Sequence, residues 1–426
     1  MRCLGLVMLL HYNPQSFWPT RFARSVPAGY PPLHPYMASP IPLSPAAGHT
    51  RLRSIDALRG LVIVIMLLDH VRETFFLHHQ VGDPMDVSAT SPDLFFSRLL
   101  AHLCAPVFVF LTGLSAWLYG AKSGSRAATA AFLAKRGAFL IALEILVVNF
   151  AWTFQFPPSV VYLQVIWVIG LSMLALAALL WLPRAALAAV GVALVAGHNM
   201  LDGLHFAAGE AMHVPWAVLH DRGWIVLSDT LRLRTSYPLL PWIGVIALGF
   251  AAGPWFQAGM PAAGRQRRLW TAGLAAVTGF VALRALNGYG QAKQWAVQDD
   301  ALHTVMSFVN ITKYPPSLMF LLLTLGVGLC LLVLIERAQS AGWVRVLCVF
   351  GAAPMFFYLL HLYVLKALYL AGEGIWGLNQ GKYLGVDNVS SVWLIALLLA
   401  VALYWPVRWF GRLKAQRRDI AWLKYL

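Results

Sequence analysis

Apolar runs of roughly 20 residues, the length that crosses a hydrocarbon core of about 30 Å, recur along the chain after residue 50. They are continuous rather than alternating, which favours helices over a membrane β-barrel. Of the 426 residues 59% are hydrophobic and only 12% are charged, too few charges to cover the surface of a soluble protein. We therefore predict an all-α, polytopic integral membrane protein with about ten transmembrane helices.

The predicted spans cover residues 58–77, 98–119, 136–153, 160–181, 185–203, 237–257, 268–287, 315–335, 344–369 and 391–411. The net charge of +15 could indicate a nucleic-acid partner, but Lys and Arg gather in alternate short segments between the spans. This is the positive-inside pattern, which excludes nucleic acid as the reason for the charge. An even number of spans then places both termini in the cytoplasm and the long loops 204–236 and 288–314 outside.

The first fifty residues differ from the rest, because they are rich in Pro and Ser and hold no sustained apolar run. We predict that residues 1–50 are a disordered extension or result from a misassigned start codon, with Met37 as the hypothetical true start. Residues 51–412 form the membrane domain, and residues 413–426 form a basic cytoplasmic tail.

The first span carries polar residues that are costly in lipid and therefore mark a candidate site. Arg59 and His70 are eleven residues apart, so they share one helical stripe and lie about 16 Å apart along the axis. Asp69, Arg72 and Glu73 adjoin His70. An ion-pair network of these charges with Arg98 would be a purely structural alternative. A histidine, however, gains and loses a proton near neutral pH, which suits a general base.

Other polar residues intrude into later spans at a similar depth. His70, Arg284 and His361 each lie in the outer half of a predicted span, which indicates one shared polar cavity. Taken alone, His361 fits a packing histidine equally well. The candidate substrate-binding residues are Arg284, Asn287, Tyr289, His361 and His102.

The segment RSIDALRGLVIVIMLLDHVRETFF, beginning at Arg53, resembles the first helix of bacterial relatives of heparan-α-glucosaminide N-acetyltransferase, a family of transmembrane acyltransferases. Further stretches resemble the family in order, among them HLCAPVFVFLTGLSAWL (102–118), TKYPPSLMFLLLTLG (312–326) and FGAAPMFFYLLHLYVLKAL (350–368). The resemblance covers the membrane domain from about residue 50 to about residue 410. It implies a protein of the bacterial inner (plasma) membrane that passes an acetyl group from cytoplasmic acetyl-CoA to a sugar on the other side.

The resemblance leaves two candidates for the catalytic base. The Arg59…His70 spacing resembles an Arg-x10-His motif of the wider transmembrane acyltransferase class. In the lysosomal member of this family, the position that matches His70 is an asparagine. The histidine implicated in its catalysis lies instead in the outward loop after the first helix. His78 and His79 are the nearest counterparts here, although their spacing differs. We favour His70 over His79.

In the predicted mechanism, acetyl-CoA rests against Arg59, Lys135 and Arg136 at the cytoplasmic face, while His70 deprotonates the acceptor amine or hydroxyl. Asp69 would orient His70, although neighbouring helix positions point about 100° apart. The sequence has no P-loop, GxGxxG, HExxH or paired-cysteine motif, so we expect no metal. A secondary transporter of a small polar solute is the alternative function. The acceptor, N- or O-acetylation, the acyl length and a homodimeric state stay open.

Overall fold

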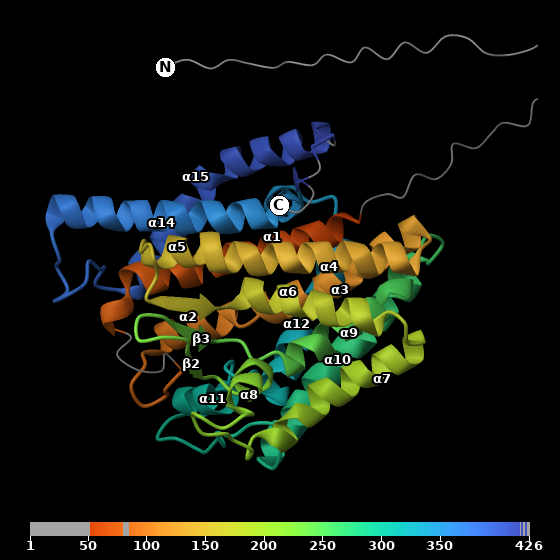
Figure 1. The fold of residues 1–426 in the computed structure, drawn as a ribbon, viewed down its shortest axis with the longest axis horizontal. Helices are drawn as coiled ribbons and strands as arrows, with labels where there is room; N and C mark the ends of the chain where they lie inside the picture. Colours follow the sequence, from red (N-terminus) through yellow and green to blue (C-terminus); the bar gives the residue numbers. More distant parts are fainter. Residues whose placement is uncertain (1–51, 80–84, 418, 421, 424–426) are drawn as a thin grey trace, which may run out of the picture. The chain divides into compact units, whose positions relative to one another are not determined.

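Helices make up most of the chain in a computed structural model, which describes residues 52–79, 85–417, 419–420 and 422–423. The predicted extension 1–50 and its Met37 lie outside these described residues. The helices, shown in Figure 1, are α1 (Arg53–Phe75), α2 (Pro92–Ala101), α3 (Cys104–Ser123), α4 (Arg126–Leu143), α5 (Asn149–Thr153), α6 (Val165–Leu179), α7 (Arg184–Gly197), α8 (His213–Leu219), α9 (Leu240–Ala251), α10 (Ala262–Leu286), α11 (Ala301–Val309), α12 (Leu318–Arg337), α13 (Gly342–Ala352), α14 (Pro354–Trp376) and α15 (Val389–Gln416).

Each predicted span contains a helix, and several of these helices can cross a membrane. Within the described residues, six helical segments are long and apolar enough to do so. They are Pro92–Ser123, Arg184–Leu201, Ala262–Leu286, Leu318–Arg337, Pro354–Trp376 and Val389–Gln416. Helices α6, α9 and α13 are apolar but shorter. A largely helical integral membrane protein is thus confirmed, whereas about ten spans with both termini in the cytoplasm stay a prediction.

The predicted spans 344–369 and 136–153 are interrupted rather than straight. Range 344–369 breaks between α13 and α14 at Ala353, where φ is −137° and ψ is 59°, because Pro354 disfavours the α conformation of the residue before it. In range 136–153 a π-helical turn at Glu144–Val148 separates α4 from α5. There the buried Glu144 carboxylate accepts hydrogen bonds from the N–H groups of Ile166 and Trp167, at 3.0 and 3.1 Å, and so caps the start of α6.

Glycines lie at the closest helix crossings. A Cβ on Gly60 would lie 1.9 Å from the carbonyl oxygen of Leu347, and one on Gly351 would lie 1.7 Å from that of Asp56. Only a residue without a side chain therefore permits α1 and α13 to pack as they do. The same arrangement recurs at Gly113 with Gly249 (α3–α9), Gly137 with Gly170 (α4–α6), Gly191 with Gly244 (α7–α9) and Gly273 with Gly326 (α10–α12).

A small sheet departs from the all-α prediction. Its strands β1 (Val160–Leu163), β2 (Trp224–Val226) and β3 (Arg232–Thr235) have the order β1-β3-β2, with β1 parallel to β3 and β2 antiparallel to it. The parallel pair joins segments some seventy residues apart, a pairing that local periodicity does not reveal.

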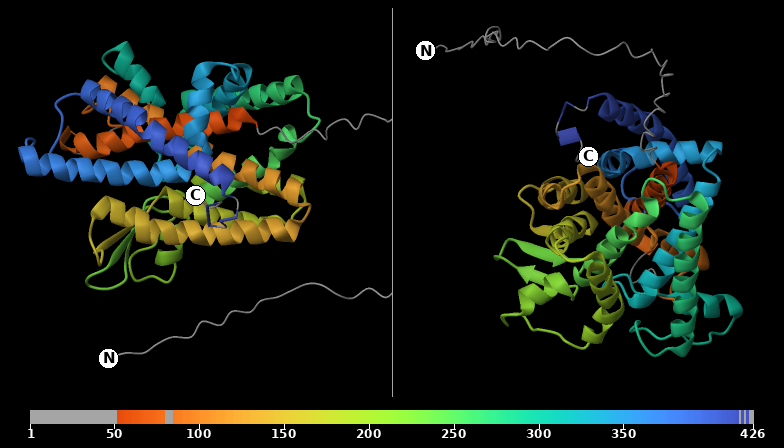
Figure 2. Two further views of the ribbon diagram at one scale, coloured as in Figure 1. Left: turned by 90° about the horizontal axis from the view of Figure 1, so that it is seen from above. Right: turned by 90° about the vertical axis from the view of Figure 1, so that its right-hand side faces the viewer.

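The sheet belongs to the predicted outer side. Figures 1 and 2 show the strands near α8, at one end of the helical domain, and β2 packs against α8. His213 of α8 bridges the carbonyl oxygens of Phe206, at 2.9 Å, and Trp224, at 3.2 Å. The predicted outer loop 204–236 therefore has an ordered structure of its own.

Candidate functional site

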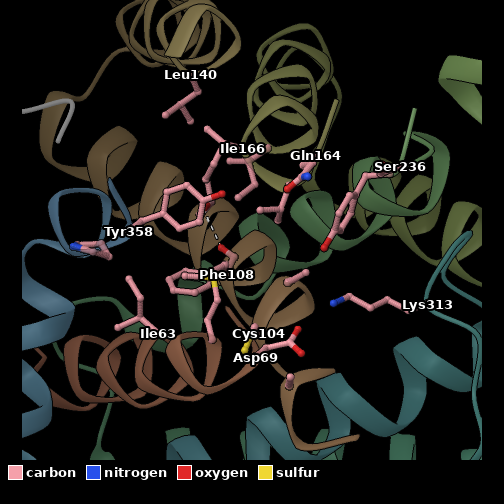
Figure 3. A pocket seen from close by; sticks show the side chains of 18 of the residues that line it. Ile63, Asp69, Cys104, Phe108, Leu140, Gln164, Ile166, Ser236, Lys313 and Tyr358 are labelled. Atoms are coloured by element: carbon pink, nitrogen blue, oxygen red, sulfur yellow. Dashed lines mark hydrogen bonds between the residues drawn. The ribbon is translucent and has the colours of Figure 1, made fainter. Parts of the chain in front are cut away.

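A cavity of about 1160 Å³ lies among α1, α3, α4, α6 and the segment that precedes α12. Its wall includes Arg136 and Lys414 from segments predicted to face the cytoplasm, and Lys293 and Lys313 from a loop predicted to face outward. In Figure 3 the Asp69 carboxylate and the Lys313 ammonium both point into this space, with Tyr358 across from them. One continuous cavity therefore has lining residues from both predicted membrane faces.

His70 lines this cavity and pairs with a second histidine behind it. Its Nδ1 lies 2.7 Å from Nε2 of His361, and Nδ1 of His361 lies 2.7 Å from the carbonyl oxygen of Phe357. The ring of Trp152 packs edge-on to His70 with centroids 5.2 Å apart. His361 is fully buried and is not part of the cavity wall, so it contacts His70 rather than the space where a substrate would bind.

Asp69 lies in a buried ion-pair network. Its carboxylate accepts two hydrogen bonds from Arg72, at 2.9 and 2.7 Å, and a further one from Arg98. Arg72 also pairs with Glu73 at 3.2 Å. No hydrogen bond joins Asp69 to His70 among the described residues, so the carboxylate neutralises two buried arginines and does not orient the imidazole by direct contact.

His102, in the turn between α2 and α3, and Cys104, the first residue of α3, line the same cavity. His102 is buried, yet neither ring nitrogen has a hydrogen-bond partner among the described residues, and its ring packs against Phe320 at 5.3 Å. An unpartnered polar group beside a cavity is available to a bound molecule. Cys104 donates to the carbonyl oxygen of Val62 and behaves as a packing residue.

The competing candidates His78 and His79 lie elsewhere. Both belong to a short 3-10 helix, Leu77–His79, that follows α1, and neither lines the cavity. Burial, followed by the neighbouring His79, lowers the pKa of His78. The His78 ring contacts Phe76 and His79 at centroid distances of 5.5 and 4.4 Å. The structure therefore brings His70, and not these two residues, to the cavity.

Arg284, predicted to bind substrate, instead holds the outer loop. Its guanidinium donates to the carbonyl oxygens of Phe308 (2.9 Å), Lys293 (2.8 Å), Ser307 (3.0 Å) and Asn310 (3.0 Å). Arg284 is only 2% exposed, and it does not line the cavity. We therefore do not include it in the proposed site.

Asn287 and Tyr289 have structural roles of the same kind. Asn287 ends α10 in the left-handed conformation, with φ of 51°, and exchanges two hydrogen bonds with the backbone of Trp295. The Tyr289 hydroxyl donates to the carbonyl oxygen of Ala196 at 2.6 Å. Neither residue lines the cavity.

The predicted donor-binding residues divide into two groups. Arg59 and Arg136 line the cavity, whereas the exposed Lys135 does not. Arg59 pairs with Asp56 at 3.3 Å and donates to Ser115. Together with Lys414 from the C-terminal helix, Arg59 and Arg136 make this end of the cavity basic.

Sequence reasoning missed the basic residues at the other end. Lys313 is only 9% exposed, points into the cavity in Figure 3, and its ammonium has no hydrogen-bond or ion-pair partner among the described residues. Arg222 stacks on the ring of Tyr314 at 5.1 Å and Arg234 on that of Trp224 at 4.8 Å, and both line the cavity. The sequence signal that could have identified Lys313 is its position directly before the predicted span 315–335, in the segment TKYPPSLMF.

Comparison with known protein families identifies a similarity over much of the chain. The family model described as heparan-alpha-glucosaminide N-acetyltransferase, catalytic, matches residues 51–289, which is more than half of the chain. No curated protein matches the chain. The matched range includes α1 and His70, whereas Lys313 and His361 lie beyond its end.

Proposed function

This chain belongs to the catalytic family of heparan-α-glucosaminide N-acetyltransferase, and on that premise we propose that it transfers an acetyl group across a membrane. The donor is cytoplasmic acetyl-CoA, and the acceptor is an amine or hydroxyl of an extracytoplasmic sugar or glycan. The observation that carries the proposal is the continuous cavity that His70 lines, with basic residues toward both predicted faces. Such a cavity lets donor and acceptor enter from opposite sides and meet at one base.

The basic end of the cavity supports the proposed donor site. Acetyl-CoA carries several phosphate charges at its nucleotide end, and Arg59, Arg136 and Lys414 line the wall there. Arg59 precedes His70 by eleven residues on α1, about 16 Å along the helix axis. A thin pantetheine arm, laid along this helix, would bring the thioester from the basic end toward the imidazole.

His70 is the proposed general base. Its imidazole takes the proton of the acceptor hydroxyl or amine while the acceptor oxygen or nitrogen attacks the thioester carbonyl carbon. The C–S bond then breaks, the thiolate of CoA leaves, and His70 returns the proton to the sulfur. Both substrates enter this step and both products leave it, so no further reactant is needed.

Lys313 is the proposed electrophilic and acceptor-binding group. Its ammonium shares the cavity with His70, lies over the ring of Tyr314 at 5.1 Å, and has no hydrogen-bond or ion-pair partner in the described part of the chain. A cation held in a partly dry cavity stabilises negative charge on a developing oxyanion or on the acceptor itself. His102, with both ring nitrogens unpartnered, is a second residue that could hydrogen-bond a sugar hydroxyl.

A secondary transporter of a small polar solute is the second candidate, because a cavity lined from both predicted faces also fits passage of a substrate. Turnover separates the two functions. A transporter would move its solute without consuming acetyl-CoA.

The test is release of free CoA by purified protein in detergent, with glucosamine and envelope glycan extracts as acceptors. We compare the wild type with His70→Ala and with His79→Ala as the matched control. We expect acceptor-dependent CoA release that falls by about 10²–10⁴-fold in His70→Ala and stays near wild type in His79→Ala. Folded protein that never consumes acetyl-CoA, with any of the acceptors, would favour the transporter.

A further inference from the structure

We propose that His361 is a positioning residue that fixes the tautomer of His70, so that Nε2 of His70 is unprotonated toward the cavity. The geometry of the pair carries this proposal. Its catalytic consequence rests on the acetyl transfer proposed above. Sequence reasoning assigned His361 to substrate binding, whereas its position behind His70 gives it a different role.

The tautomers of His70 and His361 follow from the carbonyl oxygen of Phe357, which His361 contacts on the side away from His70. The oxygen of Phe357 can only accept, so Nδ1 of His361, 2.7 Å away, must carry the proton. A neutral imidazole has one N–H, and Nε2 of His361 is therefore an acceptor. Nδ1 of His70, 2.7 Å from that nitrogen, must then be the donor. In the neutral imidazole of His70, Nε2 is then left with its lone pair.

Burial rules out the other assignment, in which His361 is doubly protonated and donates to His70. His361 is 0% exposed, and its ring packs against Phe357 and Tyr358 at centroid distances of 5.1 and 5.6 Å. No described carboxylate forms an ion pair with it. A buried imidazolium without a counter-ion is costly, so the neutral form prevails.

The remaining nitrogen of His70 belongs to a ring that lines the cavity. His70 lines the cavity, and its Nε2 has no hydrogen-bond partner among the described residues. Trp152 and Tyr358 pack against the ring with centroids 5.2 and 6.0 Å away, which restricts its rotation. The pair thus presents a fixed lone pair to the acceptor, which is the function of an orienting group beside a general base.

The first experiment compares His361→Phe, which keeps a ring but removes the acceptor, with His361→Gln, which offers a carbonyl oxygen to His70. We expect His361→Phe to lower kcat by about 10²–10⁴-fold with little change in KM, because the wrong tautomer disables the base. His361→Gln should recover at least about tenfold of that loss and should restore the wild-type pH profile of kcat. Equal losses in the two variants would assign His361 a packing role and overturn the proposal.

The second experiment does not depend on activity. Protein in bilayers is labelled with ¹⁵N at the histidine imidazoles, and His70→Gln identifies the His70 signals by difference. We expect a protonated Nδ1 and an unprotonated Nε2 for His70 at neutral pH, and a mixture of tautomers in His361→Phe. A protonated Nε2 in the wild type would refute the proposal. If acetyl transfer itself is absent, these spectra still decide the tautomer.

Discussion

Arg284→Met provides a quantitative test of the reassigned role of Arg284. The guanidinium makes four hydrogen bonds of 2.8–3.0 Å to backbone carbonyl oxygens of the outer loop. At about 1 kcal/mol net for each bond, which is below the value for charged donors, the substitution costs at least about 4 kcal/mol of local stability. Since each 1.4 kcal/mol is tenfold in an equilibrium constant, the opened state of this loop should become roughly 10³-fold more populated.

Native-state hydrogen exchange of peptides from residues 291–310 measures this change. Arg284→Lys is the matched control, because an ammonium keeps the charge but reaches about two of the four carbonyls. We expect roughly 30-fold faster exchange in that variant, against roughly 10³-fold in Arg284→Met. If Arg284→Met exchanged hydrogen in this loop at the wild-type rate and had a raised KM for the acceptor, the structural role would be refuted. Arg284 would then be a substrate-binding residue, as the sequence predicts.

Three further outcomes are expected. Lys313→Met should raise the KM for the acceptor or lower kcat by about 10–10³-fold without loss of fold, as measured by CoA release and thermal unfolding; unchanged kinetics would exclude Lys313 from the site. Gly137→Val should lower the thermal stability, because a Cβ there would lie 2.6 Å from a carbonyl oxygen of α6, whereas Gly197→Ala, with nothing within 4 Å, should be neutral; equal effects would contradict the packing argument. Hydrogen bonds to backbone carbonyls raise the pKa of His213. The stabilisation of the loop by protonated His213 is therefore complete below the ordinary histidine pKa of about 6.5. It is lost as the pH rises through the raised pKa. Exchange in residues 205–226 should therefore accelerate with pH beyond the intrinsic rate, and less so in His213→Gln.

Much of the helical architecture was predictable because a span in lipid must satisfy its backbone internally. Every predicted span contains a helix, and the largely helical membrane protein follows from the length of the apolar runs. The break at Ala353 could also have been anticipated, since Pro354 follows it. The sheet could not, because β1 pairs with β3 across some seventy residues and neither strand shows a long alternating pattern.

The lining of the cavity was predictable in part, for a physical reason. A costly polar residue in an apolar span indicates a buried polar environment, and His70, His102 and Asp69 do line the cavity. The same signal cannot separate a residue that faces a cavity from one that serves the fold. In the sequence, Arg284 looks the same as an arginine that binds a substrate at that depth of a span. Its four acceptors are backbone carbonyls, which no sequence pattern reveals.

Lys313 escaped prediction because it lies just outside a span, where a lysine usually contacts water. Only the fold shows that the loop turns its ammonium inward, into the cavity. The pairing of His361 with His70 likewise joins two residues that are 291 positions apart in sequence.

The most direct test of transmembrane acetyl transfer uses proteoliposomes with an amino sugar acceptor sealed inside and acetyl-labelled acetyl-CoA added outside. We predict label on the enclosed acceptor and free CoA outside, with both lost in His70→Ala and retained in His79→Ala. Transfer only when donor and acceptor share one side, or no use of acetyl-CoA at all, would contradict the account.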